Sequence, residues 1–228
     1  MFRDSNNLPS FNGDNKNVLN LTQKLLIKIM KYSNNERDTI SYIIKEGFDI
    51  NAKNNNGDTF FHGNELFIDV FDLVSKGFDI NSKNNDGNTV LHYIPTLEYA
   101  IEQNIFDKIL DIGFDINAKN NLDETIFHGN SLFIDILKKN INIFLLDINA
   151  KDINGNTILH DPNFFNEIIS NKKNNKYFET LLDLGFDINS RNDKGETIFN
   201  VPNAFGNKFK FPKKIIDLMV EYNFDFNI

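Results

Sequence analysis

The sequence contains no cysteine and no tryptophan among its 228 residues, and arginine occurs only three times. The lack of cysteine excludes a disulfide scaffold, a thiol nucleophile and any metal site with cysteine ligands. The sequence also shows no Gly-rich phosphate loop, no nucleophile elbow and no H-E-x-x-H pattern. We therefore expect a protein that is not an enzyme and that binds no metal or cofactor.

Long apolar runs are missing as well. The longest, such as FLL, LLI and VFDLV, fall far short of the roughly 20 residues of a membrane span. The first residues, MFRDSNNLPSFNGDNKN, are polar and lack the apolar segment of a secretion signal. A net charge of −8 argues against general nucleic-acid binding, which needs a basic surface. The expected protein is cytoplasmic, is not secreted, and binds neither membranes nor nucleic acid.

What the sequence does contain is a repeated 16-residue phrase, GFDINSKNNDGNTVLH in residues 77–92. Related copies begin at residues 47, 113, 145 and 185, and a shorter one, NFDFNI, begins at Asn223. Successive copies start 30, 36, 32, 40 and 38 residues apart. A drifting period of about 33 residues is typical of a stacked repeat protein, in which each unit touches only its neighbours.

Each copy predicts a hairpin-like loop followed by the start of a helix. Asp-Ile-Asn is expected to be a short extended piece, and the Asn/Gly cluster after it has the composition of a turn. A threonine then stands where its side chain can accept a backbone N–H and begin a helix. These threonines are Thr59, Thr89, Thr125, Thr157 and Thr197. Histidine follows three residues later in four copies, at His62, His92, His128 and His160.

The segments that precede the loops have helical spacing. Apolar residues recur seven, four and three residues before the loop glycine, as Phe106, Ile109 and Leu110 do before Gly113. This spacing places one apolar stripe on a helix. Glycine then tolerates the left-handed conformation that ends a helix. The fourth copy has no such glycine, and its preceding segment, KKNINIFLLDIN, breaks the pattern.

The order of loop, T-x-x-H turn, helix pair and G-x-D-x-N resembles the ankyrin repeat, whose usual phrases are G-x-T-P-L-H and G-A-D-V-N-A. The resemblance covers residues 15–228 and implies an all-α, ankyrin-type solenoid of about six stacked helix-turn-helix repeats with hairpin-like loops. A polar, flexible N-terminus is expected at 1–14. The units are expected near 15–58, 59–88, 89–124, 125–156, 157–196 and 197–228. The Asn- and Ile-rich style is similar to ankyrin-repeat proteins of large amoeba-infecting DNA viruses.

Proline departs from the family pattern. Pro95, Pro162 and Pro202 stand where the first helix of a unit should continue. Inside a helix, proline removes a hydrogen bond and clashes with the preceding turn, at a cost of roughly 3 kcal/mol. The first helix is therefore predicted to be a single turn, after which the chain starts a new helix. The new starts are expected at Asn64, Thr96, Asn130 and Asn163.

Phenylalanine also departs from the family, because it replaces the usual alanine of G-x-D-x-N. A ring needs more room than alanine, and we hypothesise that it fills the volume left by the short first helix and is buried. The alternative is an outward aromatic row that binds a partner. The rings are Phe48, Phe78, Phe114, Phe186 and Phe224, with Leu146 in the fourth copy.

The four histidines are candidates for a structural role. Equivalent positions in stacked units lie roughly 8–10 Å apart, whereas zinc needs its ligands about 2 Å from one centre. Copies of one position therefore cannot share a metal ion. The resemblance implies instead that each histidine holds its loop to the neighbouring loop by hydrogen bonds. Because the start of a helix disfavours added positive charge, lowered pKa values are expected.

A row of basic residues is the candidate binding surface. On an otherwise acidic molecule it could dock an acidic protein partner. The alternative is an ordinary solvated edge, because surface charges contribute little. The row consists of Lys53, Lys83, Lys119, Lys151 and Arg191.

The resemblance implies a function as a non-enzymatic protein–protein interaction scaffold or adaptor. If the chain is viral, it would act on host proteins, in the host cytoplasm or in the virus particle. The alternative is a structural or particle-packaged protein that self-assembles through its repeat surfaces. A monomer is expected rather than a homo-oligomer, and the sequence does not identify the partner.

Overall fold

The computed structural model describes residues 49–63, 70–139, 144–170, 173–199 and 211–226. Within these ranges the protein is helical and has no strand, although an isolated bridge joins Arg191 to Thr197. The all-α class is thus confirmed for this part of the chain. The N-terminal segment 1–14 lies outside the described residues, as do residues 15–48 of the first expected unit, which include Phe48, and also Asn64 and Pro202.

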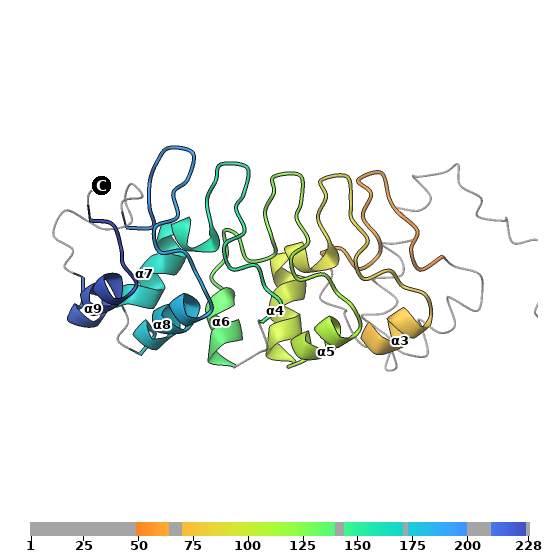
Figure 1. The fold of residues 1–228 in the computed structure, drawn as a ribbon. Helices are drawn as coiled ribbons and strands as arrows, with labels where there is room; N and C mark the ends of the chain where they lie inside the picture. The colour runs from red at the N-terminus through yellow and green to blue at the C-terminus, as the bar shows by residue number, and fades with distance from the viewer. Residues whose placement is uncertain (1–48, 64–69, 140–143, 171–172, 200–210, 227–228) are drawn as a thin grey trace, which may run out of the picture.

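The loops stand side by side in a row along one edge of the molecule, and the helices gather along the other edge (Figure 1). Buried apolar residues from loops and helices form one core cluster between the two edges. The helices are α3 (Val70–Ser75), α4 (Ile94–Glu102), α5 (Phe106–Asp111), α6 (Phe133–Lys138), α7 (Pro162–Ser170), α8 (Asn175–Asp183) and α9 (Lys213–Glu221), with 3₁₀ turns at Val90–His92 and Ile158–His160.

The prediction of a single-turn first helix is confirmed where the structure describes it. The two 3₁₀ turns have three residues each, and a longer helix follows each of them. Proline does not interrupt these helices but helps to begin them: Pro95 is the second residue of α4 and Pro162 is the first of α7. Because the first N–H groups of a helix have no intrahelical acceptor, proline costs little there. The helices consequently start one or two residues earlier than predicted.

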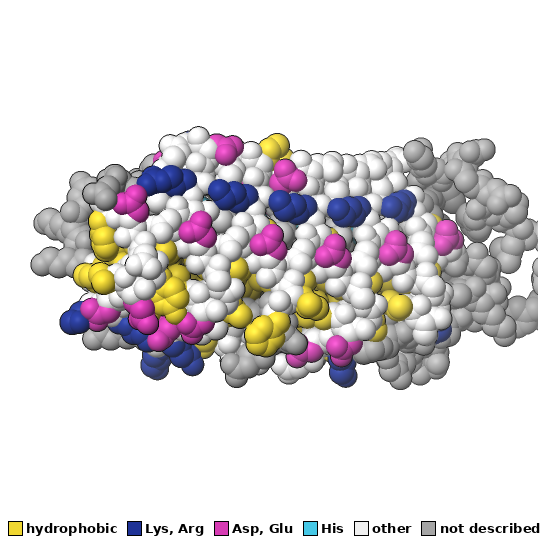
Figure 2. All heavy atoms as spheres, viewed as in Figure 1, with side chains coloured by type: hydrophobic (Ala, Val, Ile, Leu, Met, Phe, Trp, Pro, Cys, Tyr) yellow, Lys and Arg dark blue, Asp and Glu magenta, His cyan; other side chains and the backbone are white. Residues whose placement is uncertain are grey.

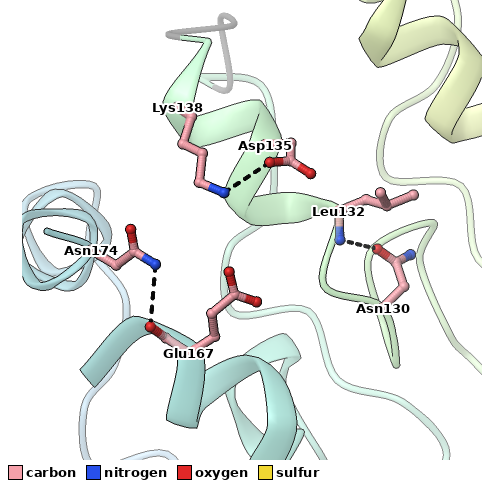
Figure 3. Close-up of polar contacts among 6 residues, drawn as sticks. All are labelled: Asn130, Leu132, Asp135, Lys138, Glu167 and Asn174. Carbon is pink, nitrogen blue, oxygen red and sulfur yellow. Dashed lines mark hydrogen bonds and ion pairs between the residues drawn. The ribbon is translucent and has the colours of Figure 1, made fainter. Parts of the chain in front are cut away.

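In the unit expected at 125–156, an asparagine bonds to the backbone just before α6. Asn130 accepts a hydrogen bond from the N–H of Leu132 at 3.0 Å (Figure 3). It also donates one to the carbonyl of Ile126 at 2.6 Å. The helix itself begins at Phe133, three residues after the predicted start. In the next unit, Asn174 donates to the carbonyl of Glu167 at 3.3 Å and so ties the start of α8 to α7 (Figure 3).

Asp-Ile-Asn is a turn and not the extended piece that was predicted. The N–H of Ala52 donates to the carbonyl of Asp49 at 3.0 Å, and the later copies form the same closed turn. The aspartate side chain reinforces it, since Asp79 accepts the N–H of Asn81 at 3.0 Å. The turn directs its isoleucine inward, and Ile80 is buried.

Burial of the loop phenylalanines is confirmed at the four positions that the structure describes. Phe78, Phe114, Phe186 and Phe224 are each at most 7% exposed. The ring of Phe78 packs edge-on against Phe61, with centroids 4.6 Å apart. An outward aromatic row is therefore wrong for these rings.

The predicted apolar stripe is buried in α8, is buried except for the half-buried Leu110 in α5, and is mostly exposed in α9. Phe106 and Phe178, seven residues before their loops, are fully buried. The equivalent Ile216 in α9, and Val220 four residues later, are exposed. The residues of α9 that enter the core are Ile215, Leu218 and Met219. The stripe predicted for α9 thus lies on a helix, with Met219 buried and its other two residues exposed.

Candidate functional site

Histidine joins neighbouring loops. The backbone N–H of Thr59 donates to Nδ1 of His62 at 3.0 Å, so the proton of the neutral ring lies on Nε2. That Nε2–H donates to the carbonyl of Asn88 in the next loop, at 3.1 Å. In the remaining copies, His92, His128 and His160 accept from Thr89, Thr125 and Thr157 and donate to Glu124, Asn156 and Glu196.

The pKa of each histidine lies below its ordinary value. Burial is the main cause, and the hydrogen bond to the next loop's carbonyl acts in the opposite direction. The lowered pKa is the predicted direction, although the prediction had attributed it to the helix start. Because both ring nitrogens are engaged, neither is free for a metal ion. In the part of the chain that the structure describes, no three histidine or acidic side chains are grouped to hold one.

The fifth threonine, Thr197, is buried like the others. Its hydroxyl oxygen accepts the N–H of Phe199 at 3.4 Å. The residue in the histidine position of this copy, Asn200, lies outside the described residues.

Asparagine forms a second link between loops, which the sequence analysis missed. Asn81 donates from Nδ2 to the carbonyl of Gly113 at 2.9 Å and accepts the N–H of Asp115 on Oδ1 at 2.8 Å. The sequence did contain a signal for this link, because the asparagine is present in every copy of D-x-N. The same pair of bonds is made by Asn51, Asn117, Asn149 and Asn189.

The basic row forms a third link between loops. The sequence had suggested either a docking surface or an ordinary solvated edge, and neither interpretation included this role. Figure 2 shows these side chains as a line along the loops, with a line of acidic side chains beside it. Each lysine ammonium donates to the backbone carbonyl of the basic residue in the next loop, and the guanidinium of Arg191 donates to Gly195 in its own loop at 2.8 Å. The lysine bonds run from Lys53 to Lys83, Lys83 to Lys119, Lys119 to Lys151 and Lys151 to Arg191, at 2.7–2.8 Å.

The loop tips are also bonded to one another. Backbone N–H groups of one tip donate to the carbonyls of the tip before it, as Asn121 does to Asp86 at 2.9 Å. The tips are so close that a Cβ added to Gly87 would lie 2.6 Å from Oδ1 of Asn121. These contacts fix the spacing of the loops, so the outer surface of the row is a rigid platform.

A hollow of about 480 Å³ lies between the loops of residues 77–92 and 113–128, and we call it the loop hollow. Two exposed apolar residues, Ile94 and Leu122, line it together with the acidic residues Asp86 and Glu124. At the next tip Ile153 is 55% exposed, and its N–H donates to the carbonyl of Leu122 at 2.8 Å. Leu122 and Ile153, which we call the tip pair, are therefore neighbours.

The tip pair departs from the other copies. The position of Leu122 is held elsewhere by Asn56, Asp86, Asn154 or Lys194, and that of Ile153 by Asn55, Asn85, Asn121 or Asp193. An exposed apolar pair contributes little to the core, so a structural role does not explain it. Sequence reasoning missed these residues because it compared what the copies share and not where one copy differs.

Comparison of the sequence with models of known protein families gave no match, and neither did comparison with curated proteins. In the part of the chain that the structure describes, no helix has the length and apolar character needed to span a membrane.

Proposed function

We propose that this chain is a non-enzymatic protein-binding scaffold, built as an ankyrin-type solenoid of about six units. Support comes from the three links that recur between successive loops, made by histidine, asparagine and lysine. Repetition of the same contacts at each step is what a stacked repeat array requires. Such arrays present extended surfaces to protein partners, so the functional class is argued by analogy with the fold.

The binding site that we propose consists of the loop hollow and the tip pair. The tip pair and Ile94 offer apolar area on a rigid, otherwise polar platform, which is where an apolar side chain of a partner can be buried. The acidic residues Asp86 and Glu124 line the same hollow. The partner segment is therefore an extended peptide with an apolar residue flanked by lysine or arginine. The basic row is less suited to docking, because its ammonium groups are already bonded to carbonyls.

Peptide display tests this proposal. A random peptide library is selected on the full chain, and the enriched peptides are measured against a Leu122→Asn/Ile153→Asn variant. Asparagine occupies both positions in other copies, so the variant is expected to keep its fold. We expect a motif of one apolar residue beside basic residues, and a loss of binding of at least tenfold in the variant. A Val220→Asn control, on α9, should bind normally.

If the enriched peptides bind the tip-pair variant as tightly as the parent, the loop hollow is not the binding site. Failure to enrich any peptide would count against a peptide-binding scaffold altogether. The resemblance to viral repeat proteins supports a host protein as the natural partner, met in the host cytoplasm or in the virus particle.

The second candidate is a structural protein that assembles through its repeat surfaces. Exposed apolar residues on and after α9 favour contact between copies. Solution mass separates the two candidates. Open-ended assembly gives polymers that grow with concentration, whereas a binding scaffold gives particles of one or two chains.

A further inference from the structure

The end of the described part of the chain, formed by α9 and the residues after it, exposes three apolar side chains. Ile216 is 44% exposed, Val220 is 62% exposed and Phe226 is 58% exposed. Figure 2 shows hydrophobic side chains gathered at this end. We call these three residues the end face. It lies on the helix edge and the loop that follows it, apart from the tip pair.

Earlier copies bury all or part of the side chain at each of the three positions of the end face, and Val74 and Leu110, at the position of Val220, are half-buried. Ile216 corresponds to Phe106 and Phe178, which are fully buried, and Val220 corresponds to Leu182, which is 3% exposed. Phe226 occupies the isoleucine position of D-I-N, and every described isoleucine there is buried, namely Ile50, Ile80, Ile116, Ile148 and Ile188. The end face thus has the composition of a contact between units, and it is continuous with the contacts that run through the stack.

The charges of α9 suggest what covers the end face. The helix begins with Lys213 and Lys214 and ends with Glu221, and it has no acidic residue in its first turn and no basic residue in its last. Both ends therefore carry the charge that the helix dipole disfavours. An antiparallel second α9 brings acidic residues to the lysine end and basic residues to the glutamate end. This arrangement relieves both mismatches at once.

The existing ion pairs leave Lys213 available for such a contact. Lys214 pairs with Glu179 of α8. Lys213 pairs with Asp217 at 2.6 Å within α9, but its side chain is 86% exposed. Val220 follows Ile216 by four positions, so the two lie on one face of the helix. In an antiparallel pair, this apolar stripe faces its own copy.

We propose that two copies of this chain associate through the end face, with α9 packed antiparallel to α9 of the second copy about a two-fold axis. A two-fold contact uses the same patch on both copies and closes at two. One nine-residue helix and a loop end offer less area than the roughly 1,200–2,000 Å² of a stable interface. The dimer is therefore weak, and it leaves the loop hollow of both copies free.

Sedimentation velocity of the full chain over a range of concentrations tests the dimer. We expect the mass to rise from that of one chain, 26.4 kDa, toward that of two as the concentration increases. Val220→Asp should stay monomeric at every concentration, with an unchanged circular dichroism spectrum. Leu122→Asp, which alters an apolar residue that is 52% exposed and lies away from the end face, should dimerise like the parent.

The antiparallel arrangement is tested by charge exchange. Lys213→Glu and Glu221→Lys should each weaken the dimer at least threefold, and the double variant should recover it, because each new charge faces its new opposite. A parent chain that stays monomeric throughout, or a Val220→Asp variant that still dimerises, overturns the proposal. Masses that grow beyond two chains overturn the two-fold contact, and failure of the double variant to recover overturns the antiparallel packing.

Discussion

A buried histidine that uses both ring nitrogens makes the stability of a loop depend on pH. In this protein Nδ1 must stay unprotonated to accept the N–H of its threonine. The folded pKa of each histidine lies below 6.5, so the unfolded chain takes up protons first as the pH falls. The contribution of each histidine to the free energy of unfolding is therefore complete above pH 6.5. It is lost as the pH falls from 6.5 toward the lowered pKa of the folded state.

We expect urea unfolding to show a higher free energy of unfolding at about pH 7.5 than at about pH 5.5. A His128→Asn variant should show a weaker dependence of the free energy of unfolding on pH. The slope should fall by up to about 1.4 kcal/mol per pH unit, the effect of one proton. Asparagine is chosen because it stands at this position in the fifth copy. A variant with the slope of the parent would show that His128 does not contribute to the pH dependence.

Two glycines separate the effect of backbone conformation from that of close packing. Gly87 and Gly113 both have positive φ, 78° and 92°, so alanine costs about 1 kcal/mol at either position. At Gly87 the added Cβ also meets the backbone N of Asn121 at 2.8 Å, whereas at Gly113 it meets nothing within 4 Å. Gly87→Ala should therefore lower the free energy of unfolding more than Gly113→Ala. Equal losses in urea unfolding would mean that the tips can move apart.

At the scale of the element, short first turns and large loop rings are expected to compensate each other. Phe114 is 5% exposed, and its replacement by alanine should cost about 3–5 kcal/mol in chemical denaturation, the usual range for a buried ring. Leu122→Ala serves as the control, since a surface change costs within roughly 0.5 kcal/mol. A near-neutral Phe114→Ala would refute the idea that the ring fills volume left by the short helix.

The elements that the sequence predicted correctly depend on local chemistry. Threonine and histidine three residues apart mark a helix start, and proline limits how far the first helix can extend. What the sequence did not reveal depends on the neighbouring unit. The lysine row could not be recognised as a link, because its acceptors are carbonyls some 30 to 40 residues away. The exposure of Ile216 and Val220 likewise depends on what packs beside α9, and not on their own helical spacing.

At the scale of the whole molecule, stability depends on how firmly each unit holds the next. Three links cross each of the first four steps between described loops, and the asparagine link contributes two of the hydrogen bonds. At the last step the asparagine link of Asn189 is described, while Arg191 bonds within its own loop. In a linear array, a weakened step in the middle separates two blocks, whereas a weakened step at the end frees only the last unit. Because Asn117 and Asn189 make the same two bonds at different steps, they form a matched pair.

We expect Asn117→Ala to cost about 1–3 kcal/mol, the penalty for removing one partner of paired polar groups, and to split urea unfolding into two transitions. The fourth unit makes this step sensitive, because Leu145 replaces the loop glycine there and is exposed. Asn189→Ala removes the bonds to Asn223 and Asp225, and should leave one main transition with faster hydrogen exchange only in α9 and beyond. Hydrogen exchange followed by mass spectrometry distinguishes the two patterns. If both variants lose protection uniformly along the chain, the units do not unfold as neighbouring blocks, and the molecule is a single cooperative core.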